Sequence, residues 1–312
     1  MRRIAEGLRF PEGPIAMADG SVLVVEIERG TLSRVGPDGS VSVVADCGGG
    51  PNGAALGPDG AVYVCNNGGF NWRHVNGMLL PGTQPDDYTG GSIQRVDLST
   101  GSVTTLYTEC DGWALKGPND IVFDRHGGFY VTDLGKGRGT EFDRGAIYYA
   151  AADGLSITTV VRPLITPNGI GLSPDEDRLY FAETMTGRVR YWDLVEPGVV
   201  AEPGTALASS SGTPSTLLGI VPDDGRVDSL AVDSEGNVCV ATLGPGSITA
   251  FSPDGSYRAI VPVPGDPMVT NICFGGPELR TAYITASAFG TLMAHEWHCP
   301  GLPLNFSDPP VG

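Results

Sequence analysis

The sequence predicts an all-β fold, a six-bladed β-propeller, from three observations. A segment of two apolar strands around a tight turn recurs six times along the 312 residues. The 46 glycines and 25 prolines are scattered singly and in turn dipeptides, as many tight turns between short strands require. No long stretch shows the 3.6-residue hydrophobic period of a helix. These features favour propeller blades over a helical repeat.

Each repeat opens with a polar residue, which is followed by an apolar run, a turn containing Gly or Asp, and a second apolar strand. β-Branched and aromatic residues flank the turns, which is typical of β-hairpins. A second hairpin completes the unit, for example at residues 31–46 and 247–263. Four strands per unit, at spacings of roughly 40 to 65 residues, are typical of blades. The repeats occupy residues 11–26, 51–67, 118–133, 167–183, 227–242 and 269–286.

The two ends of the sequence predict how the ring closes. The sixth unit has only three clear strands before a Pro-rich tail at residues 300–312. Residues 2–6 precede the first repeat, where the other units place their fourth strand. We therefore expect the N-terminal strand to complete the last blade and remove an exposed sheet edge. Residues 1–312 then form one propeller domain, with an aromatic insertion at residues 66–91 that we expect to be a lid over the pocket.

Charge and composition argue against several classes of partner. The formal net charge of −17 disfavours binding to nucleic acid or an anionic membrane, and no apolar run is long enough to span a bilayer. Residues 1–7 lack the apolar segment of a secretory signal, and the six cysteines show no paired or metal-finger spacing. We expect a cytoplasmic protein with reduced, mostly buried cysteines. His295 and His298 fall in an expected outer strand, where packing is their expected role.

One polar position recurs at the start of every repeat. The first strand of each blade lines the channel of a propeller, so we expect these side chains at similar heights around it. All of them end in carboxylate or amide oxygen, which favours Ca²⁺ or Mg²⁺ over softer metals. Such residues are also common in turns, but six in register, with acids at only two positions, favour a metal site. The six are Glu12, Asn52, Asn119, Asn168, Asp228 and Asn271 (or Thr270).

At these residues the chain resembles the senescence-marker-protein/gluconolactonase family of lactonases, which includes regucalcin-like and staphylococcal drug-responsive lactonase-like members. The resemblance implies a six-bladed propeller with a calcium-type site, in which Mg²⁺, Mn²⁺ or Zn²⁺ are substitutes in vitro. The implied metal ligands are Glu12, Asn119, Asn168 and Asp228. The matching segments are FPEGP at 10–14, GPNDIVFDRHGGFYVTD at 117–133, TPNGIGLSPDEDRLYFAE at 166–183, RVDSLAVDSEGNVCVA at 226–241 and FGGPELRTAYITAS at 274–287.

The expected activity is metal-dependent hydrolysis of a small-molecule lactone or related ester, as in a calcium-dependent, gluconolactonase-like lactonase. Asp228 is the first candidate for assisting the attacking water, and Asp133 is the alternative. Regucalcin-like members carry an arginine where this chain has Gly117, which weakens the case for a sugar-acid lactone. The candidates for contacting substrate are Asn52, Asn271, Trp72 and His74.

Three other functions stay open at this point. The same site could hydrolyse a phosphotriester, or it could serve an isomerase or cyclase of a particular pathway. The third alternative is a non-catalytic interaction propeller, because a fold does not determine a function. The sequence contains no G-x-S-x-G, P-loop or H-E-x-x-H motif, so serine hydrolase, nucleotide-binding and zincin functions lack support.

Overall fold

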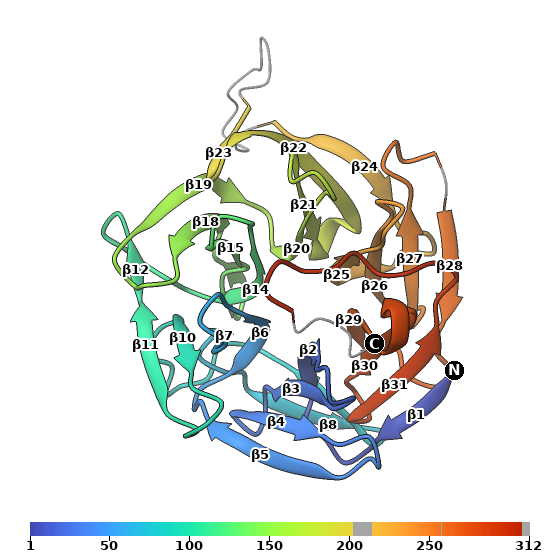
Figure 1. The fold of residues 1–312 in the computed structure, drawn as a ribbon. Helices are drawn as coiled ribbons and strands as arrows, with labels where there is room; N and C mark the ends of the chain where they lie inside the picture. Colours follow the sequence, from blue (N-terminus) through green and yellow to red (C-terminus); the bar gives the residue numbers. More distant parts are fainter. Residues whose placement is uncertain (202–213, 257, 308–312) are drawn as a thin grey trace.

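The computed structural model describes residues 1–201, 214–256 and 258–307, whose strands form six blades in a ring around a central channel (Figure 1). This arrangement confirms the six-bladed, all-β fold predicted from the repeats. The described residues also contain two short 3-10 helices, η1 (Thr184–Thr186) and η2 (Pro277–Leu279). Within the described part of the chain, no helix has the length and apolar character needed to cross a membrane.

Each blade is an antiparallel sheet with its first strand at the channel. Blade 1 contains β2 (Pro11–Ala16), β3 (Val22–Glu26), β4 (Thr31–Val35) and β5 (Val41–Asp46). Blade 2 contains β6 (Pro51–Leu56), β7 (Val62–Asn66), β10 (Ser92–Val96) and β11 (Val103–Tyr107). Blade 3 contains β14 (Pro118–Phe123), β15 (Gly128–Asp133), β18 (Gly145–Ala151) and β19 (Ile157–Leu164).

The second half of the ring repeats this pattern. Blade 4 contains β20 (Pro167–Leu172), β21 (Arg178–Glu183), β22 (Arg188–Glu196) and β24 (Thr216–Ile220), and β23 (Val199–Val200) also pairs with β22. Blade 5 contains β25 (Arg226–Val232), β26 (Val238–Leu243), β27 (Ser247–Phe251) and β28 (Arg258–Pro262). Blade 6 contains β29 (Val269–Gly275), β30 (Thr281–Ala286), β31 (Thr291–Glu296) and β1 (Arg2–Ala5). Three small hairpins lie outside the blades: β8 (Trp72–Val75) with β9 (Met78–Pro81), β12 (Glu109–Cys110) with β13 (Trp113–Ala114), and β16 (Gly137–Arg138) with β17 (Glu141–Phe142).

The N-terminal strand closes the ring, as the two ends of the sequence predict. β1 pairs antiparallel with β31, so that Arg2 lies opposite Ala294 and Ala5 opposite Leu292. Ala5 and Leu292 are buried in a cluster that also contains Val24 of blade 1. The strand therefore covers the outer edge of blade 6 and contributes to its packing against blade 1.

The hydrophobic core lies between neighbouring blades. Because both faces of a blade are covered, its second strand is apolar at consecutive positions instead of alternating. β3 reads VLVVE and β7 reads VYVCN, and every residue of both strands is buried. Between blades 2 and 3, the ring of Tyr63 packs against those of Phe123 and Phe129, with centroids 5.1 and 5.7 Å apart. This packing fixes the positions of the inner strands around the channel.

The two ends of the channel differ. We call upper the face on which the inner strands begin, and lower the face of the turns that follow them. The C-terminal tail crosses the lower end of the channel (Figure 1). Leu302 N donates a hydrogen bond to Val232 O (3.0 Å), and Asn305 Nδ2 donates one to Phe123 O (3.1 Å). The tail thereby joins blades 5 and 3, while residues 308–312 of the predicted Pro-rich tail lie outside the described residues.

Candidate active site

The inner strand of every blade is interrupted by a bulge at the recurring polar position. The pairing of β2 with β3 shifts register between Glu12 and Ile15, and that of β20 with β21 shifts between Pro167 and Ile170. The inner strands of the other four blades shift at the corresponding position. A bulge bends a strand and changes the direction of its side chains. It therefore explains how one polar side chain per blade departs from the alternation of a regular strand.

Close approach between neighbouring inner strands accounts for the glycine in the Pro-Asn-Gly motifs. A Cβ atom at Gly53 would lie 2.4 Å from Asn119 O of the next blade. One at Gly169 would lie 2.7 Å from Asp228 O. Because these distances leave no room for a side chain, glycine brings the polar residues of adjacent blades close together.

Two of the predicted ligands carry oxygen atoms without a hydrogen-bond partner. Asn168 Nδ2 donates to Thr184 Oγ1 (3.0 Å), which leaves the amide oxygen as the free end of this side chain. Both asparagines are buried, and an unpaired buried carbonyl oxygen is costly. In the described residues, four buried side-chain polar atoms lack a partner: Asn67 Nδ2, Asn119 Oδ1, Asn168 Oδ1 and Ser229 Oγ. Two of the four are thus amide oxygens of the predicted metal site.

Glu12 is held in place by its neighbours. It is buried, and its Oε2 accepts hydrogen bonds from Asn271 Nδ2 (2.7 Å) and Gly13 N (2.9 Å). The amide oxygen of Asn271 in turn accepts a bond from Ile272 N (2.7 Å). Asn271 was expected to contact substrate, and the structure places it as the partner that orients Glu12.

Burial raises the pKa values of three carboxylates in the channel, and the charge of Glu12 adds to this effect at two of them. Burial, and then the charge of Glu12, raise the pKa of Asp120 to about 7. Burial, followed by the charges of Glu12 and Asp120, raises the pKa of Asp228 well above its usual range. Burial also raises the pKa of Glu12. A cation beside these groups would favour their charged forms, so the electrostatics fit a metal site.

Asp120 is a site residue that the sequence-based candidates omitted. Its Oδ1 accepts a bond from Ile121 N (3.0 Å) and its Oδ2 one from Ile170 N (3.3 Å), so it bridges the inner strands of blades 3 and 4. A signal was present in the sequence, because the third repeat has Asp where the second and fourth have Gly after the Pro-Asn pair.

Asp133 is occupied by backbone donors. Its carboxylate accepts hydrogen bonds from Lys116 N (2.7 Å), Gly117 N (2.7 Å) and Gly135 N (2.9 Å). These bonds hold two upper loops together. Burial raises the pKa of Asp133, although the three backbone donors act in the opposite direction. Its role as the alternative base stays a prediction.

The insertion at residues 66–91 lies on the upper face, because β7 ends at Asn66 opposite Pro51, where β6 begins. Trp72 packs on Phe10, with ring centroids 5.2 Å apart, and Leu79 N donates to Ala288 O (2.9 Å). The insertion therefore extends from blade 2 over blade 1 to blade 6. Its function as a lid stays a prediction.

The remaining candidates for substrate contact differ in exposure. Asn52 is buried on β6, and Trp72 is partly buried on β8, where its ring packs on that of Phe10, two residues before Glu12. His74 is exposed on β8. Substrate contact by these three residues and by Asn271 stays a prediction.

Lys136 joins the insertion to blade 3. Its buried Nζ donates to Asn67 Oδ1 (3.0 Å) and Gly69 O (2.6 Å), and it lies 4.0 Å from the centroid of the Phe70 ring. Burial lowers the pKa of Lys136 to about 7, although the charge of Asp133 acts in the opposite direction. The sequence gave no signal of this role, because Lys136 lies outside the repeated segments.

We expect Lys136→Met to change the pH dependence of stability. A lysine in the unfolded chain has a pKa of about 10.4, so between about pH 7 and pH 10 the unfolded state binds a proton that the folded state lacks. The free energy of unfolding of the wild type should therefore rise with pH relative to Lys136→Met, by at most about 1.4 kcal/mol per pH unit. Denaturant titrations of both proteins across this range measure the difference. Parallel curves would mean that Lys136 titrates as an ordinary surface lysine.

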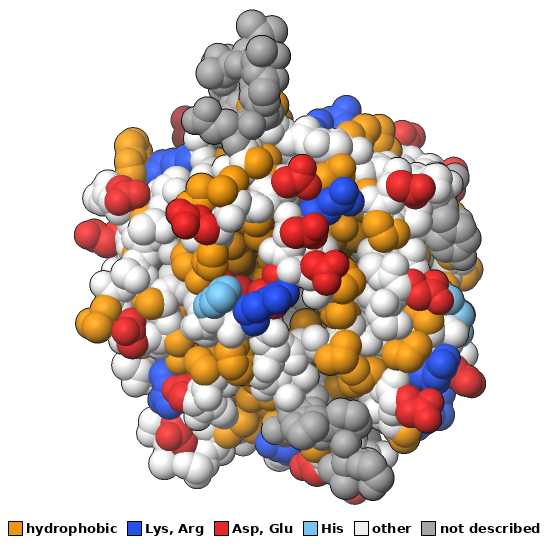
Figure 2. All heavy atoms as spheres, turned by 45° about the horizontal axis from the view of Figure 1, so that its top comes forward, with side chains coloured by type: hydrophobic (Ala, Val, Ile, Leu, Met, Phe, Trp, Pro, Cys, Tyr) orange, Lys and Arg blue, Asp and Glu red, His pale blue; other side chains and the backbone are white. Residues whose placement is uncertain are grey.

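A cavity of about 430 Å³ lies in the channel below the polar positions. All six inner strands and tail residues 302–307 line it, and Asp120 and Asn271 form part of its upper wall. The volume is in the range of small-molecule pockets. Figure 2 shows the lower face, where basic side chains are few and scattered among acidic and hydrophobic ones. Apolar residues of the inner strands, among them Ile15, Leu56 and Ile121, line most of the cavity, so the lower part of the channel is mainly apolar.

Comparison with known proteins identifies relatives of this fold and sequence. The family model described as SMP-30/Gluconolactonase/LRE-like region matches residues 10–288. The chain is 30% identical to Lactonase drp35 of Staphylococcus saprophyticus over 262 residues, which cover 83% of this chain and 71% of the relative. It is 25% identical to the gluconolactonase of Zymomonas mobilis, over 91% of this chain and 78% of the relative.

Solved structures with the same fold come from two further bacteria. A gluconolactonase of Xanthomonas campestris superposes with a TM-score of 0.71 and 21% identity, covering 94% of this chain and 88% of that one. A calcium-binding protein, regucalcin, of Agrobacterium tumefaciens superposes with a TM-score of 0.71 and 19% identity, covering 99% and 96%. At these identities the structural likeness establishes the fold.

Proposed function

The chain belongs to the SMP-30/gluconolactonase/LRE-like family, and on that premise we propose that it hydrolyses a lactone or related ester in the upper part of its channel. Relatives named lactonase and gluconolactonase support this choice of reaction. A divalent cation, Ca²⁺ first, is the proposed cofactor. The residues proposed to hold it are Glu12, Asn119, Asn168 and Asp228.

The observation that carries the proposal is the pair of unpartnered, buried amide oxygens, Asn119 Oδ1 and Asn168 Oδ1, at positions equivalent to those of the interacting carboxylates Glu12 and Asp228. Two neutral and two anionic oxygen donors suit a hard divalent cation. Without a cation, the amide oxygens lack a partner and the carboxylates repel each other. Residues that only maintained the fold would be expected to pair with one another.

The chain's own residues divide the work of hydrolysis. When bound, the cation supplies Lewis-acid polarisation of the ester carbonyl and lowers the pKa of water. Asp228 takes a proton from the attacking water, whose oxygen forms the new bond to the carbonyl carbon. The ring C–O bond then breaks, and the proton passes to the leaving oxygen, which yields a hydroxy acid. Glu12, oriented by Asn271, contributes charge and takes no proton.

Removing the metal should abolish activity and lower stability, because the carboxylates of the site then repel each other. We expect chelator-treated protein to lose lactone hydrolysis by at least about 10²-fold and to recover it with Ca²⁺. Ca²⁺ should also raise the Tm of the stripped protein, because a ligand that binds only the folded state stabilises it.

The assay uses γ-, δ-, aromatic and sugar lactones, with a phosphotriester in parallel and Mg²⁺, Mn²⁺ and Zn²⁺ as substitutes for Ca²⁺. Calcium binding with phosphotriester hydrolysis alone would replace the proposed reaction, and no calcium binding would favour an interaction propeller.

Backbone crowding at Gly117 bears on the class of lactone. A Cβ atom there would lie 2.5 Å from Gly135 O, and Gly117 N donates to Asp133 Oδ1. Gly117 therefore leaves no room for the arginine of regucalcin-like proteins without movement of the loop. We propose that the substrate lacks a sugar-acid group that such an arginine would bind.

We accordingly expect Gly117→Ala to lower the free energy of unfolding by about 1–3 kcal/mol, because the methyl group would push against the Gly135 carbonyl. Denaturant unfolding measures this loss, and Gly112→Ala, where an added Cβ meets no atom within 4 Å, serves as the steric control. Gly112 has a φ of +74°, so the control also loses some stability from backbone strain. A Gly117→Ala variant as stable as the wild type would mean that the loop can admit a side chain.

A further inference from the structure

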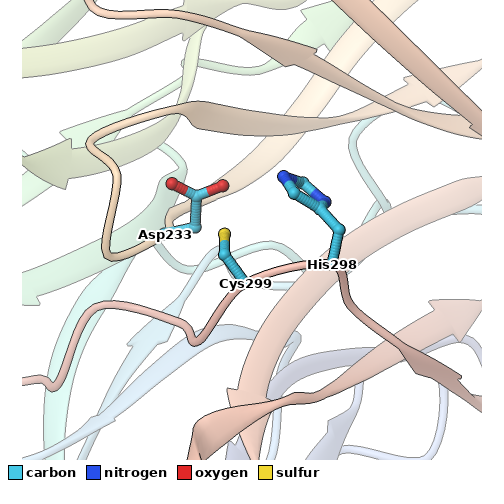
Figure 3. A group of neighbouring side chains, drawn as sticks. All are labelled: Asp233, His298 and Cys299. Atoms are coloured by element: carbon cyan, nitrogen blue, oxygen red, sulfur yellow. The ribbon is translucent and has the colours of Figure 1, made fainter.

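A second group of potential metal ligands lies on the lower face, away from the channel. Asp233, His298 and Cys299 point toward one another (Figure 3), and one potential ligand atom from each lies within 4.8 Å of the other two. Asp233 begins the turn after β25 of blade 5. His298 and Cys299 belong to the segment that follows β31 and leads into the tail. The sequence predicts His298 in an outer strand, but in the structure β31 ends at Glu296 and His298 follows it.

The carboxylate of Asp233 is buried without a cationic partner. Its side chain is 0% exposed, and among the described residues no Arg, Lys or His nitrogen forms an ion pair with it. Oδ1 accepts bonds from Glu235 N (3.0 Å), Asn237 N (2.9 Å) and Asn237 Nδ2 (3.1 Å). A buried charge ordinarily pairs with a cation or coordinates a metal.

The second oxygen, Oδ2, has weaker partners. It accepts one bond of ordinary length, from Asn237 Nδ2 (3.0 Å), and two long contacts, from Trp297 Nε1 (3.5 Å) and Cys239 Sγ (3.9 Å). Oδ2 thus keeps capacity for a further partner. The exposed imidazole of His298 and the buried thiol of Cys299 are the other two donors in the group.

We propose that Asp233, His298 and Cys299 bind a zinc ion. A thiolate, an imidazole and a carboxylate are the ligand types that Zn²⁺ uses, whereas Ca²⁺ requires oxygen ligands alone. The oxygen-only channel site and this group therefore select different metals. Because His298 is exposed, a water can complete a tetrahedral shell from the solvent side.

The position of Cys299 agrees with this assignment. Its side chain is buried next to the buried Asp233, and the exposed His298 completes the group on the solvent side. The three potential ligand atoms lie within 4.8 Å of one another, so a single ion can contact all of them after small side-chain movements.

The ion would link the start of the C-terminal tail, through His298 and Cys299, to Asp233 of blade 5. Beside the group, Ser234 N donates to Pro300 O (2.9 Å), Gly301 N donates to Leu279 O (2.8 Å), and Asp233 forms a β-bridge with Gly301. These contacts precede the segment that covers the lower cavity. Zinc would thus stabilise the junction of blades 5 and 6 and the position of the tail.

Cobalt(II) provides a probe that separates this site from the channel site. A thiolate ligand gives Co²⁺ a near-ultraviolet charge-transfer absorption, and the oxygen ligands of the channel cannot produce it. We expect this absorption in full-length protein saturated with Ca²⁺ and titrated with Co²⁺, and its loss when Zn²⁺ is added. Cys299→Ser should abolish it. The control Cys47→Ser removes a buried cysteine of blade 1 and should leave it unchanged.

A stability measurement covers the case in which Cys299→Ser does not fold. His298 is exposed, so His298→Ala should fold normally, and we expect it to weaken Zn²⁺ affinity by at least about tenfold. With the channel site saturated with Ca²⁺, Zn²⁺ should raise the Tm of the wild type by about 3 °C or more and that of His298→Ala by clearly less. The exposed control His126→Ala should respond like the wild type. Absence of the cobalt absorption in the wild type, its survival in Cys299→Ser, or an equal Tm rise in His298→Ala would overturn the proposal.

Discussion

Asp228→Asn is expected to abolish lactone hydrolysis and at the same time to stabilise the metal-free protein. The substitution keeps the shape of the side chain but removes the proton acceptor and one of two anionic ligands. General-base catalysis contributes about 10² to 10⁴ in rate, so we expect kcat/KM for the best lactone to fall by at least that factor. Steady-state kinetics with Ca²⁺ present measures the loss.

The stability of Asp228→Asn distinguishes a catalytic role from a structural one. Burial and the charge of Glu12 raise the pKa of Asp228, so above its unfolded pKa the carboxyl destabilises the folded state in the absence of metal. Asparagine cannot ionise, and the Tm of the chelated variant should exceed that of the chelated wild type. Asp254→Asn, which changes an exposed turn residue, is the matched control and should retain activity. Near-normal hydrolysis by Asp228→Asn would exclude Asp228 as the base.

Deletion of residues 1–6 is expected to cause the largest loss of stability. The deletion removes β1, exposes the edge of β31 and uncovers Leu292, which is fully buried in the intact ring. A loss of about 3–5 kcal/mol corresponds to a fall in Tm of roughly 10 °C for a chain of this size. The exposed edge should also promote aggregation.

Thermal unfolding and light scattering of the truncated and intact proteins test this expectation. Arg3→Ala is the control, because it removes only the ion pair of Arg3 with Glu6, whose side chains are 60% and 67% exposed. Such a surface pair contributes little, so Arg3→Ala should melt close to the wild type. An unchanged Tm after truncation would mean that blades 1 and 6 hold together without the N-terminal strand.

Features that repeat along the chain could be predicted from the sequence. The apolar runs of β3 and β7 reflect burial on both sides, and the turn residues between strands are local signals. The position of the N-terminal strand followed from counting strands in the sixth unit. The aligned polar residues predict a shared site in the channel. The structure leaves the amide oxygens of Asn119 and Asn168 without a hydrogen-bond partner, and their role as metal ligands stays a prediction.

Features that depend on single, distant contacts could not be predicted. Asp233 lies 65 residues before His298, and no spacing rule connects a turn of blade 5 with the segment after β31. The pKa of Lys136 depends on burial beneath an insertion from another blade. The occupation of Asp133 by three backbone donors depends on the path of two loops. In each case the sequence shows a residue type, and only the fold shows its neighbours.

The bulge in each inner strand has a consequence for how such a protein can diverge. The proposed donors lie at one irregular position of each inner strand, next to Asp120 in blade 3, while the regular strands on either side form the ring. Mutations in the strands can therefore accumulate, as long as apolar packing is kept, without altering the chemistry at the centre. Conversely, a single substitution of the polar residue at a bulge can alter the chemistry and leave the architecture intact. The chemistry of the channel and the architecture of the ring can therefore change almost independently.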